Sequence, residues 1–295
     1  MSDVNETAVP SKVPVFGSVG FAFSQGVAKY PTYLKVAWLP ALIAAAALTL
    51  PSYGLPFLLP EEIPTHQTFD TFGGLLGSPL LPIVLAAIIL QVVLAIPLYA
   101  VWYRLAAMGP EFALGGSRWP FGARERRLLL ASLFLALCFT VFGVSLFVVL
   151  PELGSGAMAV LVMLVALVAY GYCIGRMIPL LVGAAVGDEV SVSESWQITR
   201  GQAWRILLSG IVLILCTLIV FTIIGFVIAL GGGLVTVIFA SMLGNPGAFV
   251  GQLIVDIVLT FLVILPSLAV YCCFQSGIYG RLRERLLALR DRHQA

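Results

Sequence analysis

Charged residues are scarce in this chain of 295 amino acids, since Asp, Glu, Lys and Arg together make up only 10% of it. A soluble globular domain carries about 25%. Hydrophobic residues account for 60% of the chain, and its mean hydropathy is +1.06. A soluble core of this length cannot hide so much apolar surface, so we expect a protein that lies in lipid. The composition excludes a soluble enzyme, a nucleic-acid-binding module and a secreted disulfide scaffold.

Groups that carry catalysis or bind metal ions are also few. The only histidines are His66 and His293, and no zinc-protease, nucleophile-elbow or phosphate-loop motif occurs. All five cysteines lie in apolar runs without C-x-x-C spacing, which is typical of small apolar residues rather than of disulfides or metal ligands. They are Cys138, Cys173, Cys216, Cys272 and Cys273. We therefore expect no catalytic activity, no cofactor and no metal site.

Six apolar segments are long enough to cross a bilayer, whose hydrocarbon core of about 30 Å needs about 20 helical residues. They cover about 36–58, 80–102, 128–150, 157–179, 206–230 and 253–277. We interpret the glycine run at 231–233 as a flexible exit of the fifth helix, and the alternative is a hinge. The predicted fold class is therefore all-α: a polytopic integral membrane protein with six transmembrane helices.

Basic residues fall entirely on one side of this segmentation. All 16 Lys and Arg residues lie in the N-terminal segment, in the connection after span two, in the region from the inner end of span four to span five, or in the C-terminal tail, and the other three loops contain none. The positive-inside rule then places both termini in the cytoplasm, and we expect a bacterial inner (cytoplasmic) membrane. The predicted organisation is a disordered cytoplasmic tail at 1–13, one transmembrane domain at 14–280 and a basic cytoplasmic tail at 281–295.

Two stretches on the cytoplasmic side, 15–30 and 191–205, have the aromatic and polar composition of short interfacial helices. Ser191 and Glu194 fit a capping box at a helix start. Gly201 fits a break before the fifth span. The alternative is that each stretch is a cytoplasmic extension of the span that follows it.

Polar residues inside spans are the best pointers to function in such a chain. Gln252, Asp256 and Thr260 are spaced by four residues and share one helix face. Such a stripe either lines a cavity or bonds neighbouring helices. Asp256 marks the outer interface if the helix begins near Ile257, and it is buried if the helix begins earlier. Arg176, near the inner end of span four, is expected to extend to the cytoplasmic headgroups.

Close helix contacts are permitted at three G-x-x-x-G pairs, although this spacing does not identify the partner helix. The pairs are Gly171/Gly175, Gly183/Gly187 and Gly247/Gly251.

Arginines form a basic rim on the predicted cytoplasmic face. Anionic lipid headgroups attract such residues by about 1 kcal/mol each. The candidate lipid contacts are Arg124, Arg126, Arg127, Arg281, Arg283 and Arg285. The alternative is that these arginines only set the topology.

Two patches of sequence carry a resemblance to a known group. SESWQITRGQAWRILLSGIVLIL (193–215) and FAFSQGVAKYPTYLKVAWLPALI (21–43) resemble segments of uncharacterised bacterial multi-helix membrane proteins. These are similar to the membrane domain attached to some glycerophosphodiester phosphodiesterases. The resemblance implies a six-helix bundle and carries over no active site, because the phosphodiesterase chemistry belongs to a separate soluble domain.

The predicted function is that of an accessory or scaffold protein that packs with membrane lipids or another membrane protein, and no nucleic-acid partner is expected. This follows from the lack of catalytic groups and the presence of interfacial helices. The alternative is the membrane subunit of a transporter, with an ATPase as a separate chain. Under that alternative, Asp256 and the polar stripe belong to the solute pathway.

Overall fold

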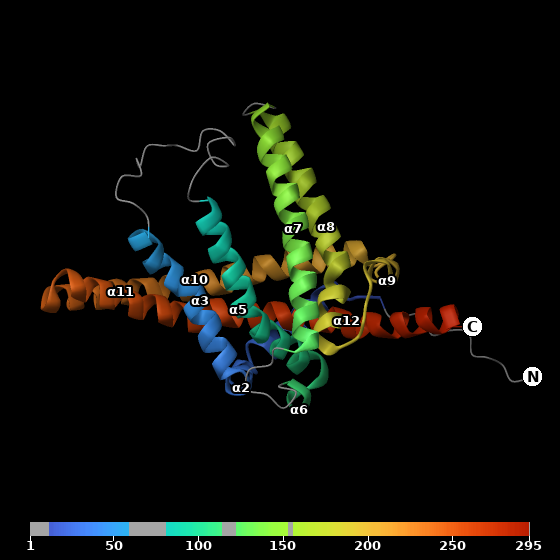
Figure 1. Ribbon diagram of the computed structural model, residues 1–295, viewed down its shortest axis with the longest axis horizontal. Helices are drawn as coiled ribbons and strands as arrows, with labels where there is room; N and C mark the ends of the chain where they lie inside the picture. Colours follow the sequence, from blue (N-terminus) through green and yellow to red (C-terminus); the bar gives the residue numbers. More distant parts are fainter. Residues whose placement is uncertain (1–11, 59–80, 114–121, 153–155, 295) are drawn as a thin grey trace, which may run out of the picture.

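The computed structural model describes residues 12–58, 81–113, 122–152 and 156–294. Every regular element within these ranges is a helix, which confirms the all-α class (Figure 1). The elements are α1 (Val15–Gly26), α2 (Tyr30–Val36), α3 (Trp38–Leu58), α5 (Leu81–Met108), α6 (Pro110–Ala113), α7 (Ala123–Glu152), α8 (Ala157–Val186), α9 (Val192–Ile198), α10 (Ala203–Leu243), α11 (Asn245–Leu259), the π-helical turn η1 (Thr260–Ile264) and α12 (Leu265–Gln294). Most of the predicted tail at 1–13 and the predicted external connection at 59–79 lie outside the described residues.

The first five predicted spans overlap α3, α5, α7, α8 and α10, and the sixth runs from α11 through η1 into α12. By length and composition, four described helical segments can cross a membrane. They are Ile89–Met108, Ala157–Val186, Ala203–Leu243 and Asn245–Arg292. Tyr30–Val36 and Trp38–Thr49 pass the same test together, with a bend of 97° between them. The described residues therefore contain four such segments, or five when the bent pair is counted as one.

The last helical hairpin departs most from the prediction. α10 continues through the glycine run at 231–233 to Leu243, so the interpretation of this run as a helix exit is wrong. Glycine is tolerated inside membrane helices, where neighbouring apolar residues keep the segment helical. The chain reverses instead at Gly244, whose φ of +67° few other residues adopt. Pro246 follows in the first turn of α11, where its missing N–H costs no hydrogen bond.

All three G-x-x-x-G pairs lie at contacts within the chain. A side chain at Gly247 would clash with the carbonyl of Phe239, and a Cβ at Gly251 would lie 2.8 Å from Cα of Thr236. These two glycines let α11 lie directly against α10. The pair at 171 and 175 lets α8 lie against α10. Of the third pair, Gly183 contacts the segment after α8, and Gly187 contacts the start of α7.

The core gathers around α12, against which α1, α5 and α8 pack. Trp102 of α5 and Ile278 of α12 are fully buried in it. α1 approaches α12 at Gly26, where a Cβ would lie 2.5 Å from Cα of Val270. Most of the stretch 15–30 thus forms a separate helix, α1, which packs on the core and is not an extension of the following span.

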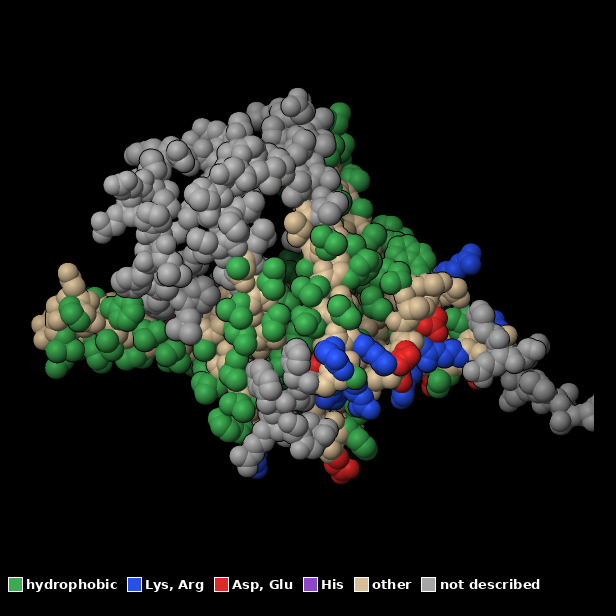
Figure 2. Space-filling view, viewed as in Figure 1, with side chains coloured by type: hydrophobic (Ala, Val, Ile, Leu, Met, Phe, Trp, Pro, Cys, Tyr) green, Lys and Arg blue, Asp and Glu red, His purple; other side chains and the backbone are tan. Residues whose placement is uncertain are grey.

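Apolar side chains face outward along α8 and α10. In the most apolar 18-residue stretch of α8, no residue is buried inside the molecule. In the corresponding stretch of α10, only 11% of the residues are buried. In Figure 1 the α7/α8 pair and the α10/α11 pair point away from the core in different directions. Figure 2 shows hydrophobic side chains over much of the visible face, with the charged side chains gathered near the C-terminal helix. A surface of this kind requires lipid or an apolar partner.

Candidate functional site

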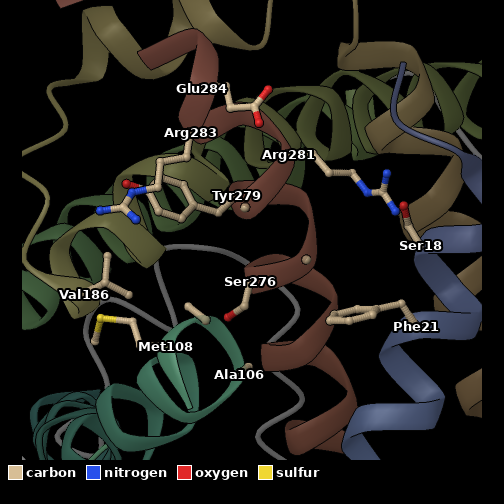
Figure 3. Close-up of a pocket in the computed structure, with 13 residues that line it drawn as sticks. Ser18, Phe21, Ala106, Met108, Val186, Ser276, Tyr279, Arg281, Arg283 and Glu284 are labelled. Atoms are coloured by element: carbon tan, nitrogen blue, oxygen red, sulfur yellow. The ribbon is translucent and has the colours of Figure 1, made fainter. Parts of the chain in front are cut away.

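A cavity of about 490 Å³ lies between α1, α12 and the ends of α5 and α8 (Figure 3). Phe21 of α1, Met108 of α5 and Val186 of α8 supply apolar lining. The polar lining residues are Ser18, Ser276, Tyr279, Arg281, Arg283 and Glu284. Ligand pockets typically have volumes of about 300–1,000 Å³ and combine apolar walls with a few polar groups, so this cavity has the dimensions of a binding site.

The two serine hydroxyls of the cavity are held by backbone carbonyls. Ser18 Oγ donates to the carbonyl oxygen of Pro14 at 2.7 Å, and Ser276 Oγ donates to that of Tyr103 at 3.4 Å. A hydroxyl has one hydrogen to donate and two lone pairs that accept. Both serines therefore offer acceptors, rather than donors, to a bound molecule.

One of the cavity arginines is neutralised by the chain itself. Arg283 Nε lies 2.9 Å from Asp188 Oδ2, and the Tyr279 hydroxyl donates to the same oxygen at 2.5 Å. Asp188 directly follows Gly187, the left-handed residue that ends α8. The end of α8 is thus fixed to α12 beside the cavity.

The second arginine at the rim has no such counter-charge. Within the described ranges, no carboxylate forms an ion pair with Arg281. Figure 3 shows its guanidinium extending toward Ser18 of α1, while the carboxylate of Glu284 points away. The cavity therefore keeps one cation that is available to a ligand.

Beyond the cavity, α12 is fastened to the segment that joins α8 to α9. We call the ion pairs Arg283–Asp188 and Arg290–Glu194 the tail clasp. Arg290 Nε lies 2.8 Å from Glu194 Oε1, and its Nη2 also donates to the carbonyl oxygen of Glu189. The predicted basic tail therefore continues α12 as an ordered helix, held to residues about 96 positions earlier in the chain.

Three of the six predicted lipid-contact arginines have partners within the chain. Besides Arg283, Arg127 pairs with Glu189 at 2.6 Å. Arg285 Nη1 lies 3.4 Å and 3.3 Å from the carbonyl oxygens of residues 198 and 200, to which it donates. These contacts within the chain hold the three arginine side chains in place. Their contact with lipid stays a prediction.

The other three arginines of this set differ in their surroundings. Arg124 lies against Gly187, where a Cβ would be 2.8 Å from its Nε. Arg126 is exposed on the first turn of α7. Arg281 alone lines the cavity between α1 and α12 without a carboxylate partner in the described parts of the chain.

We expect the tail clasp to open in acid. The hydrogen bond from Arg290 lowers the pKa of Glu194 from 4.5 to about 2. A carboxyl group whose pKa is lowered by folding stabilises the folded state above its unfolded pKa, and this contribution is lost as the pH falls through the folded value. Amide hydrogen exchange in α9 and the end of α12, corrected for intrinsic rates, should therefore accelerate as the pH falls from about 4.5 toward about 2.

Glu194→Gln is the matched variant for this experiment. Glutamine keeps the capping box in which the Ser191 side chain accepts from the backbone of position 194, and it removes only the charge. The variant should exchange rapidly at the same sites already at neutral pH. If its exchange still accelerated between pH 4.5 and 2 as in the unchanged protein, the ion pair would not be the cause.

Arg176 is held in a cage of aromatic and hydroxyl groups. Its guanidinium carbon lies 3.7 Å from the ring centre of Trp196, and its Nε donates to Thr199 Oγ1 at 3.1 Å. In return, Ser195 Oγ donates to the carbonyl oxygen of Arg176 at 2.7 Å. Arg176 is buried, so the expectation that it extends to the headgroups is wrong; it anchors α9 to α8 instead.

The predicted helix start before the fifth span is confirmed. Ser191 Oγ accepts from the backbone N–H of Glu194, whose carboxylate accepts from the N–H of Ser191, so the capping box is complete. Gly201 has a φ of +78° between α9 and α10. These features make α9 a helix of its own.

The polar stripe lies well inside a continuous helical segment. Gln252 Nε2 donates to Asp256 Oδ1 at 3.0 Å, and Thr260 Oγ1 donates to the carbonyl oxygen of Asp256 at 2.8 Å. Since α11 begins at Asn245, Asp256 is not at a helix start; its side chain is half-buried. The π-helical turn η1 begins at Thr260, and such turns are frequent at functional sites.

Sequence reasoning identified only part of this geometry. Arg281 is among the predicted lipid contacts and Phe21 lies in the predicted interfacial stretch, but the sequence does not single out Ser18 and Ser276. They come from segments far apart in the chain, and no local motif links them. The stripe was visible because its three residues lie on one helix.

Comparison with protein-family models, with curated proteins and with solved structures gives no match. The resemblance of residues 193–215 and 21–43 to the membrane domain of glycerophosphodiester phosphodiesterases therefore stays a prediction. Function has to be argued from the cavity, the tail clasp, the stripe and the outward-facing apolar helices.

Proposed function

We propose that this chain is an integral protein of a bacterial inner membrane with six transmembrane helices, cytoplasmic termini and no catalytic activity of its own. Its role is that of an accessory or scaffold protein that packs with lipid or with another membrane protein. The observation that carries this proposal is the outward-facing apolar surface of α8 and α10, of which almost none is covered within the molecule. α1 and α9 lie along the cytoplasmic headgroup layer in this arrangement.

The distribution of charge supports the orientation. The ends of α5 and α8 and the start of α7 meet at the Arg104–Glu125 ion pair, and the tail clasp joins α12 to the segment after α8. Figure 2 shows the basic side chains gathered on this side of the molecule. The apolar hairpins extend away from that side (Figure 1). An asymmetry of this kind agrees with the positive-inside rule.

Gentle extraction followed by native mass spectrometry tests the scaffold role. We expect a stoichiometric protein partner to accompany the chain, and we expect substitution of exposed leucines on α10, such as Leu215→Ser and Leu218→Ser, to release it. Both side chains are exposed.

Reporter fusions test the proposed topology. A reporter fused after Glu152 should be external and one fused after Gly187 should be cytoplasmic. The reverse pattern contradicts the proposed topology.

A second candidate function is favoured by the hydrogen-bonded stripe and its π-helical turn, which suit the membrane subunit of a transporter. Purified protein in liposomes, alone or with a co-purified ATPase, separates the two functions. Solute flux that Asp256→Asn abolishes assigns the chain to transport. If the protein moves no solute, we expect Asp256→Asn to change only the stability of the fold.

A further inference from the structure

The cavity between α1 and α12 combines one available cation, two hydroxyl acceptors and an apolar wall. We propose that it binds the headgroup of one anionic phospholipid, with the phosphodiester at Arg281 and a hydroxyl-bearing headgroup against Ser18 and Ser276. The inference deepens the proposed function and rests on its placement of this face at the cytoplasmic leaflet.

The charge of the ligand follows from Arg281. Arg283, the other cavity arginine, is satisfied by Asp188, whereas Arg281 has no ion pair with a carboxylate of the described residues. Its guanidinium extends across the cavity toward α1 (Figure 3). A guanidinium offers several N–H donors in a planar fork that matches the oxygens of a phosphate.

The headgroup chemistry follows from the serines. Ser18 and Ser276 have already committed their hydrogens to the carbonyls of Pro14 and Tyr103. They can accept hydrogen bonds but have no second hydrogen to donate. A glycerol headgroup supplies hydroxyl donors to them, while a choline headgroup supplies none.

The apolar part of the ligand has a route out of the cavity. Phe21 lines the wall and is partly exposed on α1, and Phe16 on the same helix is 77% exposed. Because Phe21 lines the cavity and Phe16 is exposed on the same helix, which we place in the headgroup layer, acyl chains can leave along α1 into the bilayer. A soluble phosphate compound gains nothing from such an apolar exit.

Lipid titration of the purified, delipidated full-length chain in detergent tests this site, with retained lipid counted by native mass spectrometry. We expect one phosphatidylglycerol per chain to be retained in preference to phosphatidylcholine. Arg281→Gln should weaken phosphatidylglycerol binding about fivefold, since a basic residue contributes about 1 kcal/mol to such contacts. Arg292→Gln, an equal charge change on an exposed part of α12, should leave the affinity unchanged. Equal losses in the two variants, or equal retention of the two lipids, overturn the proposal.

A steric variant tests the cavity independently of charge. Gly280 lines the cavity, and a Cβ there meets nothing within 4 Å, so Gly280→Leu can fill the space without a backbone clash. Removing glycine also favours the helix by about 1 kcal/mol, so the variant should fold. We expect it to lose the retained phosphatidylglycerol, and wild-type retention by this variant contradicts the site.

Inorganic phosphate in large excess distinguishes the two sources of a phosphate group. Phosphatidylglycerol that stays bound supports a lipid site, whereas displacement by phosphate assigns the cavity to a soluble phosphate compound and overturns the lipid source. Failure of the lipid-site proposal can be distinguished from failure of the scaffold proposal. If only the scaffold proposal is wrong, no protein partner co-purifies, but the Arg281→Gln and Gly280→Leu variants still lose lipid. If only the lipid-site proposal is wrong, a protein partner co-purifies, but the lipid count is the same in these variants and the unchanged protein.

Discussion

Replacement of Glu125 by Gln is expected to lower the free energy of unfolding by about 3–5 kcal/mol, the cost of breaking a buried ion pair from one side. Arg104 of α5 and Glu125 of α7 are both almost fully buried and form a direct ion pair. Arg104 Nε also donates to the carbonyl oxygen of Ala185 at 2.8 Å, and Gly122 N donates to Glu125 Oε2 at 2.7 Å. The pair thus joins α5, α7 and α8 at one point.

The protonation state of this pair follows from its partners. Burial acts to raise the pKa of Glu125, but the hydrogen bonds from Arg104 and Gly122 outweigh it, so the pKa lies below its ordinary value. Glu125 is therefore ionised at neutral pH. Glu125→Gln leaves Arg104 charged and buried without a counter-charge, which is why the expected loss is large.

Thermal unfolding in detergent measures the effect, with Glu111→Gln as the control, because Glu111 is exposed on α6. The control should change stability by less than about 0.5 kcal/mol. The double replacement Arg104→Met with Glu125→Leu should recover most of the loss, because apolar residues can replace a buried pair at little net cost. Equal stabilities of Glu125→Gln and the control would show that the pair contributes nothing.

Gly26→Ala is expected to destabilise the docking of α1 by about 3 kcal/mol, at the upper end of typical overpacking costs. The added Cβ would lie 2.5 Å from Cα and 2.7 Å from N of Val270. These are backbone atoms of α12 that no side-chain rotation can move. α1 must therefore shift as a whole and widen the cavity that it shares with α12.

Gly20→Ala is the matched control within the same helix. A Cβ at Gly20 meets nothing within 4 Å, so this variant should gain up to about 1 kcal/mol from helix propensity. Relative to the unchanged protein, Gly26→Ala should be cleaved faster within residues 15–30 and should unfold at a lower temperature. Gly20→Ala should be cleaved more slowly there and should unfold at a higher temperature. Similar protease sensitivity of both would mean that α1 does not depend on its close approach to Val270.

The sequence predicts the helices well and their ends less well. Long apolar runs fix the position of each helix, and the capping box at Ser191 is legible because it needs only four consecutive residues. The end of α10 was misjudged because glycine in water marks a helix exit, whereas the apolar surroundings of residues 231–233 favour continuation. The reversal at Gly244 depends on a positive φ that composition does not reveal.

The site was harder to predict because it is assembled from distant segments. The ion pairs of the acidic residues at 188–194 follow from no local pattern, because α12 has to continue past its predicted span before Arg290 reaches Glu194. Arg176 has the length to reach the headgroups, and only the position of Trp196 above its guanidinium shows that it turns inward. Such contacts depend on how helices cross, which local spacing does not determine.

The tail clasp also has a consequence for the order in which the protein is made. Arg290 is separated from Glu194 by 96 positions, so a ribosome adding about 5–20 residues per second completes the second partner roughly 5–20 s after the first. During translation Glu194 and Asp188 await their arginines while α10 and α11 are synthesised. The contact between α12 and the segment after α8 therefore forms only after Arg290 has emerged, which gives α10 and α11 time to insert before this contact is made.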